Sequence, residues 1–137
     1  MMKNFSKSAG LLSLLLVIAS FMPNALQAQT YPDGTLLRGK NDFKVYLVHN
    51  GTKRWLKNID IFNSYNLDWK DIQAVSDKII NAIPPTKLIQ TKGDIKVYLL
   101  NDLGYRRHIT NPDVFNSYAF NWNEIAQVSP EELSAYS

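Results

Sequence analysis

Apolar and polar positions follow strand-like patterns in two short segments near the start of the chain's folded part. Residues 34–39 have Thr35, Leu36 and Leu37 between two glycines, and residues 44–48 are rich in β-branched and aromatic side chains, so both segments predict strands. Asn50-Gly51 is typical of a type I′ hairpin turn, so we expect residues 53–57 to return as a third, antiparallel strand. The segment 44–48 is apolar on both faces of the pleat, which favours a place in the middle of a small sheet.

After the strands, the pattern favours short helices. Asn58 with Asp60, and the run Asn111-Pro112-Asp113, are helix starts in which Asn is the N-cap and an acid lies in the first turn. A second start follows each of these, at Ser76-Asp77 and at Ser129-Pro130-Glu131-Glu132, and the latter has the sequence of a capping box.

The two halves of the chain repeat one unit. The offset is 52 residues before the hairpin turn and 53 after it, because the second turn, residues 101–104, is one residue longer. Such a period indicates tandem duplication. The matches are KVYL at 44–47 and 96–99, Gly51 and Gly104, Arg54 and Arg107, FNSY at 62–65 and 115–118, and Trp69, Ile72, Val75 and Ser76 with Trp122, Ile125, Val128 and Ser129.

We therefore predict an α+β fold of two tandem repeats, each a three-stranded antiparallel meander followed by one or two short helices. The predicted divisions are a signal peptide at 1–28, a lead-in at 29–33, repeat unit 1 at 34–84 and repeat unit 2 at 85–137. Since neither unit is large enough to bury much apolar surface alone, we expect the units to pack on each other or on a further copy.

The first 28 residues have the layout of a secretory signal peptide. Lys3 and Lys7 precede an apolar run from Leu11 to Met22, which is too short to span a bilayer, and residues 25–28 offer a cleavage site. An uncleaved anchor is the alternative. We expect a secreted protein, whether extracellular, periplasmic or on the cell surface, with no membrane span after cleavage.

Charge and residue types limit the function. Cleavage would remove two of the 15 basic residues and none of the 12 acidic ones, which leaves a net charge of +1 and argues against nucleic-acid binding. The chain has no cysteine and two histidines, His49 and His108, without a ligand pattern around them. It also lacks nucleophile and phosphate-loop motifs. We predict a protein that is not an enzyme and that uses no cofactor or metal.

The two repeated arginines predict structural ion pairs. By strand alternation, Arg54 and Arg107 share a face with apolar residues, and an inward arginine needs a partner. The candidates are Asp60 for Arg54 and Asp113 for Arg107, each at the start of the following helix. A ligand-binding role for the arginines is the alternative.

Positions near the hairpins that differ between the units are candidates for ligand contacts. A tryptophan between two lysines suits stacking on a sugar ring together with binding of an anionic group, although Trp55 could equally pack against the second unit. The predicted ligand-binding residues are Lys53, Trp55, Lys57, Arg106 and His108. The aromatic residues common to both units are expected to pack in the cores: Tyr46 and Tyr98, Phe62 and Phe115, Tyr65 and Tyr118, Trp69 and Trp122.

The motifs GTLLRG at 34–39 and KVYLVHNGTKRWL at 44–56, followed by FNSY, WKDI and a closing Val-Ser, resemble a repeat of exported bacterial proteins. That repeat occurs singly or in tandem, often beside cell-wall-hydrolase or surface-layer-like regions, and has no established activity. The resemblance covers residues 33–136. The second unit departs from it at residues 87–91, which lack the Gly-Thr opening, and at His108, which replaces the tryptophan.

The resemblance implies an envelope or extracellular setting and an accessory role. Together with the residues above, it leads us to expect a non-catalytic module that binds a cell-envelope polymer, peptidoglycan or polysaccharide. The alternative is a structural or protein-interaction module of the cell surface. The expected partners are accordingly a cell-wall polysaccharide or another envelope protein, with self-association as a further option.

Overall fold

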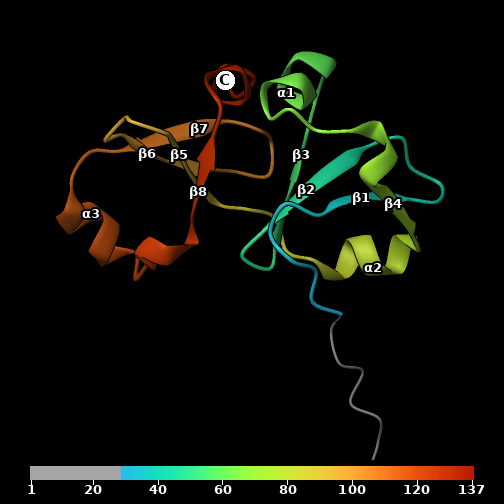
Figure 1. Ribbon diagram of the computed structural model, residues 1–137. Coiled ribbons are helices and arrows are strands. Elements are labelled where there is room, and N and C mark those ends of the chain that lie inside the picture. Colours follow the sequence, from blue (N-terminus) through green and yellow to red (C-terminus); the bar gives the residue numbers. More distant parts are fainter. Residues whose placement is uncertain (1–28) are drawn as a thin grey trace, which may run out of the picture.

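The computed structural model describes residues 29–137, so the predicted signal peptide lies outside the described residues. Unit 1 contains β1 (Leu36–Gly39), β2 (Val45–His49), β3 (Thr52–Trp55), α1 (Ile59–Ser64), the 3₁₀ helix η1 (Trp69–Asp71), β4 (Ile72–Val75) and α2 (Asp77–Ala82). Unit 2 contains β5 (Leu88–Thr91), β6 (Val97–Leu100), β7 (Arg106–Ile109), α3 (Pro112–Ser117), η2 (Trp122–Glu124), β8 (Ile125–Val128) and α4 (Pro130–Ser134). The predicted α+β class with two tandem repeats is confirmed (Figure 1).

Each unit forms its own four-stranded sheet, with the strand orders β3-β2-β1-β4 and β7-β6-β5-β8. The first three strands of each sheet are the predicted antiparallel meander. The fourth strand was not predicted. It pairs in parallel with the first, Leu36 opposite Ile72 and Leu88 opposite Ile125, after the chain has crossed from one sheet edge to the other through α1 or α3.

Both faces of each sheet carry an apolar core, as the two apolar faces of residues 44–48 suggest. One face packs on α1 or α3 and the other on α2 or α4. In unit 1 the buried residues are Leu36, Val45, Leu47, Leu56, Ile61 and Phe62 on the first face, and Leu37, Val48 and Ile80 on the second. The equivalent clusters of unit 2 are Leu88, Val97, Ile109 and Phe115, and Ile89, Ala126, Val128 and Tyr136.

Local signals fix the turns and helix starts as expected. Asn50 and Gly51 have φ angles of 46° and 69°, the positive values that a type I′ turn requires. The side chain of Asn58 accepts a hydrogen bond from Ile61 N, and that of Asn111 accepts one from Val114 N, both at 2.9 Å. Ser76 and Ser129 cap α2 and α4 in the same way. These side chains satisfy backbone donors that the short helices leave free.

The two units meet along β3 and α1. The segment from Pro84 to Thr86 runs beside β3: Lys53 N donates to Pro84 O at 2.9 Å, and Thr86 N donates to Lys53 O at 3.0 Å. The C-terminal helix α4 then lies beside α1, between the two sheets (Figure 1). Helix α4 thus packs on its own sheet and also on unit 1, where Ala135 joins the core around Phe62. None of the helices formed by residues 29–137 has the length and hydropathy that crossing a membrane demands.

Candidate functional site

Three of the five predicted ligand-binding residues hold helix ends. Lys53 Nζ donates to the carbonyl oxygens of Ile80, at 2.6 Å, and Ile83. At the equivalent place in unit 2, Arg106 Nη1 donates to Leu133 O at 2.7 Å. Lys57 Nζ donates to Ala135 O at 2.9 Å. Each cation therefore meets carbonyl oxygens in the last turn or at the C-cap of α2 or α4, an arrangement that also suits the helix dipole.

Aromatic rings support the same cations. Lys53 Nζ lies 5.7 Å from the centre of the Tyr46 ring, and Arg106 lies 5.3 Å from that of Tyr98. Lys57 Nζ lies 4.4 Å from the Tyr136 ring of the other unit. Burial lowers the pKa of Lys53. These contacts give the side chains of Lys53, Lys57 and Arg106 a structural task, which makes them less available to a ligand.

The other two residues, Trp55 and His108, lie in different places. Trp55 is half-buried, with Lys44 Nζ 4.9 Å from its ring, and lines a cleft of about 230 Å³ between the units together with Lys53 and Lys57. His108 is exposed, 5.5 Å from the Tyr98 ring, and lines a separate groove within unit 2. The structure therefore does not bring the five predicted residues together into one site.

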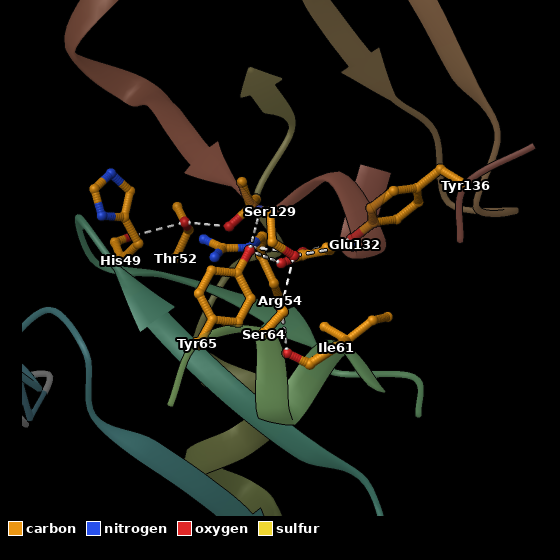
Figure 2. A network of polar contacts seen from close by, with 10 residues as sticks. His49, Thr52, Arg54, Ile61, Ser64, Tyr65, Ser129, Glu132 and Tyr136 are labelled. Atoms are coloured by element: carbon orange, nitrogen blue, oxygen red, sulfur yellow. Dashed lines mark hydrogen bonds and ion pairs between the residues drawn. The ribbon is translucent and has the colours of Figure 1, made fainter. Parts of the chain in front are cut away.

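Arg54 forms the most buried polar site, but its partner is not Asp60. Arg54 Nε donates to Glu132 Oε1 at 2.8 Å, and the two side chains are 3% and 1% exposed (Figure 2). Asp60 is exposed, because Asn58 already caps α1 and the first-turn acid faces solvent. Arg107 and Asp113 are also both exposed, and no ion pair within residues 29–137 joins them. The predicted pairs Arg54–Asp60 and Arg107–Asp113 are wrong.

Two tyrosines complete the bonding of the Glu132 carboxylate. Tyr65 donates to Oε2, and Tyr136 donates to Oε1 at 3.1 Å. Tyr65 Oη in turn accepts from Ser129 N at 2.8 Å, and Ser129 Oγ accepts from Glu132 N at 3.1 Å. Figure 2 shows these side chains converging from β3, α1 and α4. Every oxygen of the buried carboxylate has a donor, which is the condition for a stable buried ion pair.

This arrangement alters the expected capping box. Ser129 does cap α4, but Glu132 does not return to the Ser129 N–H, as the motif would have it; its carboxylate binds Arg54, and Tyr65 satisfies Ser129 N. The sequence carried a signal for this: the residue equivalent to Glu132 in unit 1 is Ile79, so the glutamate belongs to α4 alone. A difference between repeats thus marked the residue that joins them.

The electrostatics of the pair follow from burial. Burial by itself lowers the pKa of Arg54, but Glu132 and Tyr65 outweigh it, so the pKa is raised and the guanidinium stays charged. Burial, followed by the charge of Glu132, raises the pKa of the Tyr65 and Tyr136 hydroxyls. Both tyrosines therefore remain hydrogen-bond donors well into the alkaline range.

A second feature occurs in both units: a stacked tryptophan that faces solvent. The Trp69 ring lies 4.1 Å from that of buried Phe62 with 14° between the planes, and Trp122 lies 3.8 Å from Phe115 with 20°. Yet Trp69 is 56% exposed and Trp122 is 51% exposed. The predicted core packing is right for the phenylalanines, and Tyr46, Tyr65 and Tyr98 pack at the margins of the cores, but it is wrong for Tyr118, which is 53% exposed. Each indole packs one face on its phenylalanine and is otherwise largely exposed.

The 3₁₀ helices η1 and η2 position these indoles. The side chains of Asp68 and Asn121 cap them by accepting hydrogen bonds from Lys70 N and Asn123 N, both at 2.9 Å. In unit 2, Trp122 lines a groove of about 430 Å³ with the exposed side chains of Ile95 and His108. The equivalent positions in unit 1 are Phe43, which is also largely exposed, and Trp55. We call each indole with its phenylalanine an aromatic platform.

Acids and histidines are dispersed. His49 Nδ1 lies 3.1 Å from Asp33, and no three His, Asp or Glu side chains within residues 29–137 are grouped so that they could hold a metal ion. Comparison of the chain with protein-family models, with curated proteins and with solved structures finds no match. The function must therefore be argued from the platforms, the cleft and the junction.

Proposed function

We propose that the protein is a non-catalytic module of the cell envelope that binds a polysaccharide, such as the glycan of peptidoglycan, on its two aromatic platforms. The observation that carries this proposal is the exposed indole stacked on a buried phenylalanine at the same position of both units. A rigid indole face offers apolar area for a sugar ring and loses little conformational freedom on binding. The platforms, rather than Trp55 and its lysines, are the primary contacts in this proposal.

Two platforms suit a repetitive polymer. Each contact with one sugar ring is weak, but the second platform binds the same chain intramolecularly, so the combined affinity exceeds that of either alone. The proposed setting is secretion to the envelope, which is supported by the signal-like segment 1–28 and by the resemblance to repeats of exported proteins.

Sedimentation of residues 29–137 with insoluble peptidoglycan tests this function. We expect the wild-type chain to sediment, Trp69→Ala and Trp122→Ala each to reduce the bound fraction, and the double variant to remain in the supernatant. Trp55→Ala is the matched control, since Trp55 is a half-buried tryptophan on a strand outside the platforms. Circular dichroism checks that each variant is folded.

Two results would contradict the proposal. One is a folded wild-type chain that does not sediment, and the other is a double variant that sediments as well as the wild type. Loss of binding in Trp55→Ala alone would move the site to the cleft of about 230 Å³ between the units.

A protein-interaction role is the second candidate, and a specific observation favours it. On the face of unit 2 that corresponds to the Arg54 site, the side chains of Arg107 and Tyr118 are exposed.

A further inference from the structure

Unit 2 carries a second copy of the residues that receive Glu132. In unit 1, Arg54 and Tyr65 bind the Glu132 carboxylate, and Ser64 Oγ lies 2.8 Å from the capping Ser129 Oγ. We call these three residues the Arg54 face. The residues 53 positions later are Arg107, Ser117 and Tyr118, which we call the Arg107 face. All three residue types are the same.

The backbone presents both sets alike. Arg54 stands opposite Leu47 in the pairing of β2 with β3, and Arg107 stands opposite the equivalent Leu99 in the pairing of β6 with β7. Ser64 Oγ donates to the carbonyl of Ile61 at 2.7 Å, and Ser117 Oγ donates to that of Val114 at 2.8 Å. Unit 2 therefore holds the three side chains on the same scaffold.

The two faces differ in what covers them. Arg54 is 5% exposed beneath α4, whereas Arg107 is exposed and Tyr118 is 53% exposed. Within residues 29–137, no ion pair or hydrogen bond involves the Arg107 side chain. Tyr118 instead stacks on Phe120, with ring centres 5.3 Å apart and 13° between the planes. An uncovered arginine beside an aromatic surface is a composition common at protein interfaces.

The edge of β7 also provides the path by which a further unit would arrive. At the junction of units 1 and 2, Pro84 O accepts from Lys53 N, and the next two residues follow β3 into unit 2. Ser137, which is equivalent to Pro84, accepts from Arg106 N in the same way, also at 2.9 Å. The edge of β7 thus begins the same contact that joins the two units described above.

The chemistry of the Arg107 face selects its occupant. Helix α2 does not fit, because it has Ile79 where α4 has Glu132. Helix α4 of a second copy does not fit well either, since its removal would leave that copy's own Arg54 buried without its carboxylate. The occupant that matches is a helix that starts with Ser-Pro-Glu-Glu or an equivalent, so that a carboxylate follows the cap by three residues.

We propose that the Arg107 face is a docking site for the terminal helix of a further repeat unit of this type, with a glutamate at the place of Glu132. The carboxylate accepts hydrogen bonds from Arg107 and Tyr118, and the capping hydroxyl meets Ser117. Docking is head-to-tail, as in repeat arrays where each unit contacts only its neighbours. The proposal is independent of glycan binding, because the platforms and the Arg107 face share no residue.

A three-unit chain tests the proposal: residues 29–137 followed directly by a second copy of residues 85–137. We expect Arg107→Ala to lower the folding equilibrium constant of this chain by about tenfold or more, because it removes a charged hydrogen-bonding partner of the appended glutamate. In the two-unit chain the same substitution should leave it unchanged. Replacing the appended glutamate by Gln should remove most of the difference. Lys92→Ala, which removes an exposed cation elsewhere in unit 2, is the matched control.

A second measurement applies even where the appended unit fails to fold. Isotope-labelled residues 29–137 are titrated with a peptide of residues 125–137, and the Nε–H resonance of Arg107 is followed by NMR. We expect it to shift with this peptide and to stay in place when the peptide carries Gln at position 132. Three results would each overturn the proposal. Arg107→Ala could have equal effects in both chains, or the Arg107 resonance could stay in place with the peptide at millimolar concentration. The third result is the formation of dimers by exchange of α4 between copies.

Discussion

The two units differ most at a pair of arginines with the same neighbours in sequence. Arg54 is buried and bound to Glu132 of the other unit, whereas Arg107 is exposed and carries no ion pair within residues 29–137. Their own sheets and helices do not explain the difference, since both units have the same strand order and equivalent cores. The sequence of a repeat unit therefore does not determine by itself whether its arginine is buried. Burial depends on whether the following unit packs a helix on it.

The largest expected effect comes from removing the carboxylate of this pair. Glu132→Gln leaves the charge of Arg54 buried without a counter-charge, and we expect a loss of about 3–5 kcal/mol in the free energy of unfolding. Arg107→Ala, which removes the exposed arginine of the Arg107 face, should cost less than about 0.5 kcal/mol in residues 29–137. Urea unfolding of residues 29–137, followed by circular dichroism, measures both.

A double substitution separates charge from packing in that result. Arg54→Met with Glu132→Leu removes both charges, and apolar replacements of buried ion pairs are often neutral or stabilising. Recovery of most of the lost stability would confirm that the unpaired charge causes the cost. A Glu132→Gln variant as stable as the wild type would instead show that the junction contributes little to the fold.

The same comparison explains which parts the sequence could predict. The type I′ turn at Asn50-Gly51 and the caps at Asn58 and Ser129 depend on neighbours within a few residues, so local patterns suffice. The pairing of β4 with β1 depends on residues 36 positions apart, and the four residues Ile72–Val75 are too few to show a strand pattern in the sequence. Glu132 lies 78 residues from Arg54, and a nearer acid, Asp60, was available as a partner.

The platforms show a second limit. Identity of Phe62 and Trp69 with Phe115 and Trp122 predicts a shared structural role, but it does not say how much of each ring the fold covers. Exposure depends on where η1 and η2, which begin at these tryptophans, lie relative to the sheet, and that is a property of the folded unit. The replacement of the apolar Ile79 by the charged Glu132 was a clearer signal, because a carboxylate at that place needs a partner that α2 does not need.

An intermediate effect is expected from the tyrosine hydroxyls. Tyr65→Phe removes the donor to the buried Glu132 carboxylate and the acceptor for the part-buried Ser129 N. We expect a loss of about 1–3 kcal/mol. Tyr118→Phe removes the equivalent hydroxyl from the open face and should change the free energy of unfolding by less than about 0.5 kcal/mol. Equal effects at the two positions would mean that the closed and open faces do not differ energetically.

The smallest effect at neutral pH is the one that depends on ionisation. Burial and Glu132 raise the pKa of Tyr65 and Tyr136 in the folded state above the ordinary value of 10.0. Below pH 10 both states keep these protons, so the contribution to stability is complete. Above pH 10 the unfolded chain ionises first, and stability falls until the pH passes the folded-state values. Burial lowers the pKa of Lys53 in the folded state from 10.5, so the folded chain releases this proton first and stability rises with pH just below 10.5.

The tyrosine effect is therefore measured as a difference between variants, by urea unfolding from pH 8 to pH 11. We expect the decline above pH 10 to be steeper in the wild type than in Tyr65→Phe with Tyr136→Phe, although the double variant is less stable at pH 8. Tyr118→Phe should follow the wild-type profile, because its hydroxyl takes no part in the junction. A double variant with the wild-type slope would show that the alkaline sensitivity arises outside the contact between the units. The pKa of the tyrosine in the Arg54 face would then have no more effect on stability than that of the tyrosine in the Arg107 face.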